Sequence, residues 1–345
     1  MSASATDRFM LATGRHYTGL DPEKYGPHAE RVPFHFVQMA DTQLGMEAQF
    51  DRKIEGWERE LQLMVQAVEE VNRIRPAFAI VCGDLVNEYP PGERGGKSAD
   101  ETIRAKQEAD FKCVMAGIDA SIPLMCLCGN HDIGNRPNSL TIKRFTECFG
   151  DDYFVFWCHG VKCLVVNSQL WKDDSDAVEL REMMDTWLDK ELETATVGPS
   201  PPRILVFSHI PPFLFRPDED NGYFNLEVGF RQRLLAKFTA KGVVAWFCGH
   251  YHRNVGGRFC DEEGRELEVV VTGAVGTQII DKPEGNPLEL SGIGGHAIGE
   301  EASGFRIVHV LSDRIEHEWK TFKDLKDAAS SSSEPQPSKR LRADL

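Results

Sequence analysis

Three adjacent polar residues first suggest that this sequence carries chemistry. Asn130, His131 and Asp132 follow an apolar run within residues 127–135, "LCGNHDIGN". An unpaired polar group in a protein core costs about 1–3 kcal/mol. An amide, an imidazole and a carboxylate in succession are therefore either solvated or directed at a ligand, and a single segment is compatible with both interpretations.

The same arrangement follows four other apolar runs. These are 34–40 before Asp41 and Gln43, 77–83 before Asp84, 203–208 before His209, and 243–249 before His250 and His252. Imidazole, carboxylate and amide groups without thiolates suit Mn, Fe, Zn or Mg. With Asn130, these groups are too many for one tetrahedral site but suit two ions about 3.5–4 Å apart. We therefore expect two divalent metal ions, with the carboxylate of Asp84 bridging them.

The elements that must position these side chains alternate between strand and helix. The apolar runs, with 123–129 and 161–167, have the length of buried strands, and helical periodicity fills the segments between them, namely 52–73, 99–118, 178–194 and 227–240. This alternation predicts a largely parallel sheet, at whose carboxyl edge ligands bind. Beyond residue 250, strand-like segments follow without long helices, at 267–273, 304–311 and 314–322. We expect a second, more antiparallel sheet there.

The motifs occur in the order D-x-Q, GD, GNHD, a strand-end histidine and GHxH. This order resembles that of the calcineurin-like metallophosphoesterases, over residues 32–325. The segments "GDDYFVFW", "NSQ", "YFNL" and "GHYHRN" are also similar to the calcineurin-like phosphoesterase domain-containing protein 1 family of metal-dependent serine/threonine-protein phosphatases. The resemblance implies an α/β fold of four layers, an αββα sandwich of two mixed β-sheets flanked by helices.

The resemblance also implies a role for each residue of the motifs. One ion would be held by Asp41, Asp84 and His252, and the other by Asp84, Asn130, His209 and His250. Gln43 replaces the usual histidine at the first ion, where an amide oxygen is a weaker ligand than imidazole. His131 would face the substrate and protonate the leaving oxygen as a general acid. Asp132 would orient the turn.

Two positions depart from the patterns of the better-known branches. Asn87 and Glu88 stand where the protein-phosphatase pattern places an aspartate, which pairs with the catalytic histidine, and an arginine. Asn87 also excludes the metal-bound tyrosine of purple acid phosphatases. We therefore expect the chain to lie outside both branches, with a weaker partner for His131.

Two further side chains are candidates for substrate binding. Arg253, directly after the His-x-His motif, is interpreted as a phosphate clamp or as a solvated arginine. Tyr223 belongs to the aromatic loop 211–226, which follows His209 and suits either a nucleobase or a peptide. A glycine-rich stretch, 289–301, is expected to be a flexible insertion.

The resemblance implies a metal-dependent phosphomonoester hydrolase, most consistent with a serine/threonine-protein phosphatase. Its nucleophile would be a hydroxide held by the two ions. The same metal core also serves diesters, so a phosphodiesterase acting on a nucleotide or another small diester remains an alternative. A second alternative is a non-catalytic scaffold of this fold that has lost its metals, for which Gln43 is the one indication.

Composition restricts the partners. The 345 residues carry a net charge of −15, which repels the phosphate backbone of duplex nucleic acid. The resemblance implies a phosphoprotein substrate. No apolar run approaches the roughly 20 residues of a membrane span. The nine cysteines include no CxxC pair, as in reduced cytoplasmic proteins. We expect a cytoplasmic monomer with a polar arm (1–31), a metallophosphoesterase domain (32–325) and a disordered Ser/Pro-rich tail (326–345).

Overall fold

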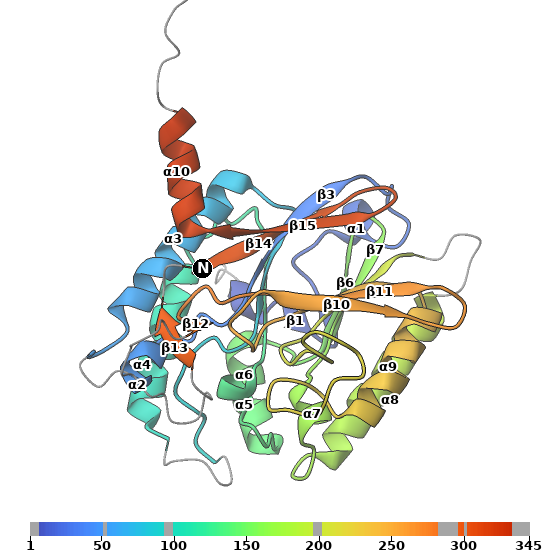
Figure 1. Cartoon of the computed structure of the whole chain (residues 1–345), viewed down its shortest axis with the longest axis horizontal. Coiled ribbons are helices and arrows are strands. Elements are labelled where there is room, and N and C mark those ends of the chain that lie inside the picture. Colours follow the sequence, from blue (N-terminus) through green and yellow to red (C-terminus); the bar gives the residue numbers. More distant parts are fainter. Residues whose placement is uncertain are drawn as a thin grey trace, which may run out of the picture.

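The structure is a computed structural model that describes residues 7–50, 54–92, 99–195, 202–281, 296–299 and 302–332. Two mixed β-sheets form its centre (Figure 1). The first sheet has five strands in the order β15 (Ile315–Thr321), β14 (Gly304–Val310), β3 (Phe34–Met39), β4 (Ala79–Cys82) and β5 (Leu124–Leu127). The last three strands run parallel to one another, and β14 and β15 are antiparallel to their neighbours.

The second sheet has eight strands. Their order is β1 (Ala12–Thr13), β2 (His16–Tyr17), β6 (Phe154–Cys158), β7 (Val161–Val165), β8 (Ile204–Phe207), β9 (Val243–Cys248), β11 (Glu266–Val271) and β10 (Val255–Cys260). Strands β7, β8, β9 and β11 are parallel. A separate pair, β12 (Gln278–Asp281) with β13 (His296–Gly299), is antiparallel.

The two sheets pack face to face through aromatic side chains. Phe36 of β3 stacks on Phe78 with ring centroids 4.6 Å apart, and it meets Phe207 of β8 and Phe247 of β9 edge-on at 5.6 and 5.4 Å. All four rings are fully buried, so each contributes roughly 1.5–3 kcal/mol of hydrophobic stabilisation. This layer fixes the distance between the strands of the two sheets whose ends carry the polar motifs.

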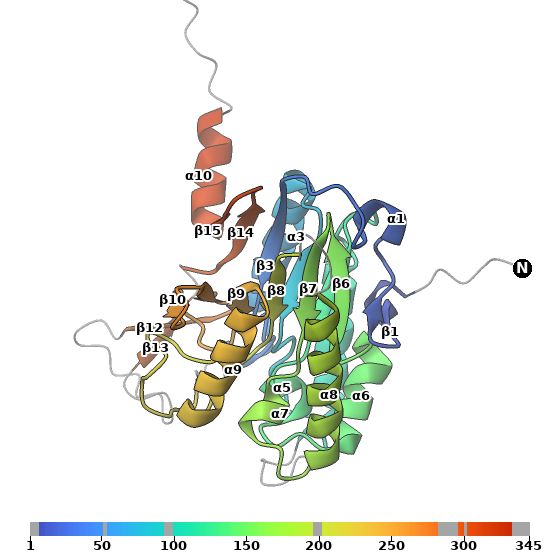
Figure 2. The same ribbon diagram turned by 90° about the vertical axis from the view of Figure 1, so that its right-hand side faces the viewer.

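Helices complete the outer layers (Figure 2). The longer ones are α3 (Glu58–Ile74), α4 (Glu101–Met115), α6 (Ser139–Phe149), α8 (Val178–Ala195), α9 (Val228–Ala240) and α10 (Phe322–Ser332). The shorter ones are η1 (Arg8–Met10), α1 (Pro22–Tyr25), α2 (Met46–Phe50), α5 (Asn130–Ile133) and α7 (Gln169–Lys172). Helices α3 and α4 cover the first sheet, and α9 covers β9 and β11 of the second. The predicted α/β sandwich of two mixed sheets with flanking helices is confirmed.

The prediction that the strands beyond residue 250 form a second sheet of their own is wrong. Those strands divide between the two sheets: β14 pairs with β3, and β11 pairs in parallel with β9. Both pairings cover strand edges that would otherwise expose unpaired backbone groups. Part of the expected flexible insertion, 296–299, also pairs as a strand, whereas 289–295 and 300–301 lie outside the described residues.

The segments at both ends differ from their expected character. Residues 7–31 do not form an arm separate from the domain, because β2 pairs with β6 and Phe9 packs its buried ring against Phe149. At the other end, α10 continues to Ser332 and projects from the body in Figure 1, and residues 333–345 lie outside the described part of the chain. The domain limits at 31 and 325 stay predictions. None of the described helices has the length and apolar character needed to cross a bilayer.

Candidate metal centre

The loops that follow five parallel strands meet at one end of the sandwich. They follow β3, β4 and β5 of the first sheet and β8 and β9 of the second, so both sheets contribute side chains. Backbone hydrogen bonds join the loops to one another: Asp41 donates its N–H to Gly83 (3.0 Å), and Gly249 donates to His209 (3.1 Å). The parallel arrangement thus gathers the motifs at a common carboxyl edge, as the topology of open α/β sheets requires.

The first group of candidate ligands surrounds His209, which is fully buried. Its Nε2 atom lies 3.2 Å from Asp84 Oδ2, 3.2 Å from Asn130 Oδ1 and 3.1 Å from His250 Nδ1. Asp84, His209 and His250 each offer a ligand atom within 4.8 Å of the other two. These groups have the geometry of a site for one cation.

The second group consists of Asp41, Asp84 and His252, with ligand atoms again within 4.8 Å of one another. His252 Nε2 lies 3.3 Å from Asp41 Oδ1, and the carboxylate of Asp41 also accepts the backbone N–H of His250 at 3.0 Å. Asp84 belongs to both groups. Its carboxylate is buried between them, as a shared ligand would be.

The hydrogen bonds of the imidazole rings leave the inner nitrogens suited to metal ligation. His209 donates Nδ1–H to the carbonyl of Cys82 (2.8 Å), and His252 donates Nδ1–H to the carbonyl of Thr277 (2.6 Å). Each bond fixes the tautomer and turns the Nε2 lone pair towards the carboxylates. Lone pairs that converge in this way repel one another without a cation between them, so the residues present fit a metal ion.

The pKa shifts of the buried groups also indicate that the site favours a bound positive charge. Burial opposes the charged form of His209, yet the carboxylates of Asp84 and Asp41 raise the pKa of this imidazole to about 9. Burial likewise opposes ionisation of Asp84, but the surrounding histidines hold the pKa of its carboxyl well below the usual range. For His250, burial and the neighbouring His209 lower the pKa. A cation bound here would supply the positive charge that the carboxylates otherwise draw from a proton on His209.

The backbone is strained at the candidate ligands. Five of the non-glycine residues with a left-handed φ are at this site: Asp41 (52°), Gln43 (35°), Asp84 (51°), His250 (72°) and His252 (53°). Each such conformation costs of order 1–3 kcal/mol and persists only where the surrounding structure imposes it. Strain of this kind clusters at functional sites, which supports a functional reading of these five positions.

Gly129 allows the loops after β4 and β5 to approach closely. A Cβ atom at this position would lie 2.1 Å from Asp84 Oδ1 and 2.4 Å from the backbone nitrogen of Asp84. The carboxylate of Asp132 sits beneath the same turn, where it accepts hydrogen bonds from the N–H groups of Gly129 (2.7 Å) and Leu85 (3.1 Å). Burial and the nearby charge of Asp84 raise the pKa of Asp132 to about 7.

His131 stands at the pocket side of the site. Its Nδ1 lies 2.5 Å from the carbonyl oxygen of Asn87, and its Nε2 lies 3.0 Å from Gln43 Nε2 and 3.3 Å from the hydroxyl of Tyr89. The expected weaker partner of His131 is thus the backbone carbonyl of Asn87, whose side chain carries an amide rather than a carboxylate. Arg104 supports the turn by donating to the carbonyl oxygens of His131 (2.8 Å) and Asp132 (2.9 Å).

Gln43 faces both His131 and the pocket. Its Nε2 donates to Asn87 Oδ1 (3.1 Å), and its buried Oε1 has no hydrogen-bond partner among the described residues. This amide oxygen is therefore available as a ligand, although Gln43 stays a predicted one.

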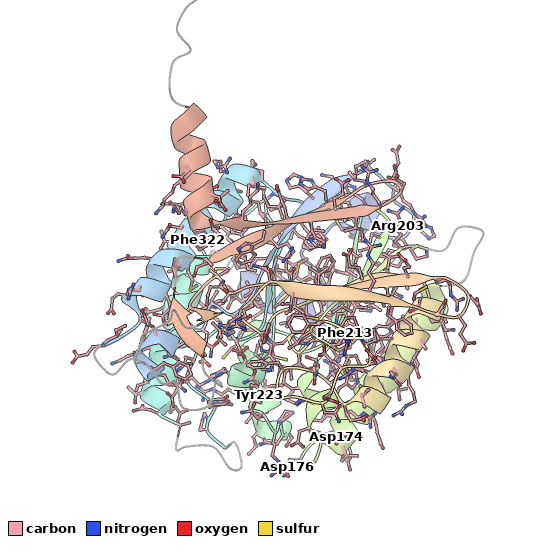
Figure 3. The ribbon with its side chains drawn as sticks, viewed as in Figure 1. Asp174, Asp176, Arg203, Phe213, Tyr223 and Phe322 are labelled. Atoms are coloured by element: carbon pink, nitrogen blue, oxygen red, sulfur yellow. The ribbon has the colours of Figure 1, made fainter. Side chains whose placement is uncertain are left out.

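A pocket opens above the two groups. Its walls are Gln43, Met46, Gln49, Phe50, Asp84, Tyr89, Asn130, His131, Tyr223, Phe224, His250, His252 and Ile279. Tyr223 borders the pocket and is half-exposed, and Figure 3 shows this side chain over α5 in that view. Its role in substrate binding stays a prediction. Arg253 is not in the wall. Its guanidinium donates to the carbonyl of Ile279 (2.6 Å) and to the hydroxyl of Tyr251 (3.3 Å).

The sequence patterns missed Tyr89 and Asn135. Both lie in loops after β4 and β5, and both bind the pocket residues through side-chain hydrogen bonds. The one signal in the sequence was an aromatic residue within the polar turn "NEYPPG", five positions after Asp84.

A buried constellation of carboxylates, imidazoles and an amide at the edge between two mixed sheets defines a metallophosphoesterase. The model of the calcineurin-like phosphoesterase family matches residues 34–254, and the chain belongs to this family. It is a metal-dependent phosphoesterase. The serine/threonine-protein phosphatase CPPED1 of Danio rerio is 38% identical over 326 residues, 92% of this chain and 94% of the relative. The human protein of the same name is 35% identical, over 94% and 95% of the two chains.

Solved structures share the fold at low sequence identity. A dimetal phosphatase from Danio rerio is 14% identical, with a TM-score of 0.51 over 84% of this chain and 96% of that one. A purple acid phosphatase from yellow lupin seeds is also 14% identical, with a TM-score of 0.55 over 86% and 52%. The Plasmodium protein GAP50, described as an anchor in the inner membrane complex, has a TM-score of 0.53 at 10% identity over 85% of each chain.

Proposed function

We propose that this protein is a serine/threonine-protein phosphatase that hydrolyses phosphomonoesters at a dinuclear metal centre. The observation that carries the proposal is the position of Asp84, which is shared by two groups of buried ligands beneath an open pocket. Asp41, Asp84 and His252 would hold one ion, with Gln43 as a weak further ligand. Asp84, Asn130, His209 and His250 would hold the other.

Different residues around the ions would orient the metal ligands and transfer the proton. Bound divalent ions would supply positive charge for the phosphate oxygens and lower the pKa of a water molecule. Cys82 and Thr277 keep the Nε2 atoms of His209 and His252 turned inward. The Nδ1–H of His131 is held by the Asn87 carbonyl, so Nε2 is the atom at which the ring would take up a proton and then pass it to the leaving oxygen. Asp132 fixes the turn that carries His131.

The pocket supports a side chain of a protein as the substrate. Its volume is about 230 Å³, below the roughly 300–1,000 Å³ typical of small-molecule pockets. This space suits a phosphoryl group and one side chain better than a whole nucleotide. Among the described residues of its wall there is no lysine or arginine to hold further phosphates, whereas Met46, Phe50, Phe224 and Ile279 present apolar atoms.

A phosphodiesterase is the second candidate function. The ring of Tyr223 is 53% exposed at the edge of the pocket, where it could stack on a nucleobase. A non-catalytic scaffold is the third candidate, and its one indication is the amide of Gln43 in place of a histidine.

A metal titration with three substrates distinguishes these functions. The chelated protein is titrated with Mn²⁺ and assayed on an aryl phosphate, a bis-aryl phosphodiester and a phosphoserine peptide. We expect metal-dependent turnover of the monoesters, with the peptide preferred. Preference for the diester would favour the second candidate, and no turnover with any metal would favour the scaffold. The metal identities, the monomeric state, the cytoplasmic location and the lack of binding to duplex nucleic acid stay predictions.

A further inference from the structure

Four side chains next to the candidate metal ligands form a closed ring of hydrogen bonds. Asn130 Nδ2 donates to the hydroxyls of Tyr89 and Tyr223, at 3.2 Å each. Asn135 completes the ring, because its Nδ2 donates to Tyr89 (3.1 Å) and its Oδ1 accepts the hydroxyl proton of Tyr223 (3.2 Å). The ring joins the loops after β4 and β5 to the loop 211–226.

The ring determines which end of the Asn130 amide faces the metal centre. An amide nitrogen has two N–H donors, and the two tyrosine oxygens accept one each. Oδ1 therefore points away from the ring, to a position 3.2 Å from His209 Nε2. If the amide rotated by half a turn, it would direct N–H groups at the site and could not ligate a cation.

The ring also orders His131. Tyr89 accepts from both asparagines, so its own hydroxyl proton is directed at His131 Nε2, 3.3 Å away. The phenol ring packs against the imidazole with centroids 4.2 Å apart. A single hydroxyl thus orients a candidate ligand and the candidate acid together.

Tyr223 is held in place by its own loop, although half of its surface is exposed. Glu219 accepts the backbone N–H groups of Leu214 and Phe215, at 2.8 Å each, and Lys172 donates to the carbonyl oxygens of Gly222 and Asn225, at 2.6 Å each. These bonds close the loop on both sides of Tyr223. The tyrosine therefore reaches Asn130 from a supported segment.

We propose that Tyr89 and Tyr223 are positioning residues that lock Asn130 as an oxygen ligand of the His209 cluster. The inference rests on the proposed dinuclear centre. It predicts that the two hydroxyls control the affinity of one metal site and leave the other unchanged. Loss of partners that orient a metal ligand typically costs 10–100-fold in affinity.

The test measures Mn²⁺ binding to the chelated full-length protein by the electron paramagnetic resonance signal of free Mn²⁺. In Tyr223→Phe and in Tyr89→Phe, we expect the tighter of the two binding steps, which belongs to the His209 cluster, to lose about 10–100-fold in affinity. The other step, at the site of Asp41 and His252, should stay as in the wild type. Tyr17→Phe is the matched control, since it removes a buried hydroxyl bonded to the carbonyl of Leu124, far from the pocket. Thermal melts verify that each variant is folded.

A double variant tests whether the tyrosines act through the orientation of the Asn130 amide. Asn130→Asp presents an oxygen from either side of the carboxylate, so adding Tyr223→Phe to it should cause no further loss of affinity. The inference would be overturned if Mn²⁺ affinity were unchanged in both tyrosine variants, or if both binding steps lost affinity equally. It would also be overturned if Tyr223→Phe lowered the affinity as much in the Asn130→Asp protein as in the wild type. A wild-type protein that binds fewer than two ions would instead overturn the proposed dinuclear function on which it rests.

Discussion

Asp84 and His209 come from different sheets, and their Oδ2 and Nε2 atoms lie 3.2 Å apart at the buried edge between them. Asp84 follows β4 of the first sheet, and His209 follows β8 of the second. The packing of Phe36 on Phe207 therefore sets the spacing of the candidate ligands as well as the stability of the core. Changes that shift one sheet against the other should affect metal binding before they unfold the protein.

Gly129→Ala tests this close packing. The new Cβ would meet the carboxylate and the backbone of Asp84, and the backbone cannot yield without moving a strand end. We expect a loss of about 1–3 kcal/mol in the free energy of unfolding, typical of overpacking, together with weaker metal binding. Chemical denaturation and metal titration measure the two effects. Gly222→Ala is the control for stability, since its nearest neighbour would be 3.8 Å away, and an equal effect there would contradict the account.

His131→Asn should separate catalysis from metal binding. The variant should keep its metals, because the ring of His131 contacts Gln43, Asn87 and Tyr89 and lies outside both ligand groups. Turnover should fall by about 10²–10⁴-fold, the usual contribution of a general acid. The loss should be smaller for aryl phosphates with good leaving groups. Metal loss as large as that expected from removing Asp84 would show that His131 is itself a ligand.

Gln43→His should strengthen the first metal site. Imidazole is a stronger ligand than an amide oxygen, so metal affinity should rise by one to two orders of magnitude, about 1.4–2.8 kcal/mol. Because the amide also donates to Asn87 beside His131, turnover at saturating metal should not rise with it. Metal content and activity after dialysis are compared across a Mn²⁺ series. Coinciding curves for the two proteins would mean that residue 43 does not contact the metal.

Strand ends could be predicted from the sequence because burial imposes a simple pattern on parallel strands. The runs before Asp41, Asp84 and His209 are β3, β4 and β8 within two residues at each end. The sequence did not predict which sheet each strand beyond residue 250 joins, since β11 and β14 look alike as apolar runs. They differ in the strand beside which each one pairs, which is β9 for β11 and β3 for β14. That choice depends on the assembled sheets.

The candidate ligands could be predicted because their types and order are unusual together. Their supports could not, because backbone atoms provide many of them. The carbonyl groups of Cys82 and Thr277, which orient His209 and His252, leave no trace in the side-chain pattern. Tyr89 was missed for a related reason, since only the folded turn brings its hydroxyl to Asn130.

The most direct test of the dinuclear phosphatase is the metal content of Asp84→Asn. Asp84 is common to both ligand groups, and an amide in its place leaves two cations facing each other without the charge that separates them. Wild-type and variant protein are loaded with Mn²⁺, dialysed, and assayed for metal per chain and for hydrolysis of an aryl phosphate. The account predicts two ions per chain in the wild type, and loss of most metal and nearly all turnover in the variant. A variant that retains two ions and turns over near the wild-type rate would contradict it.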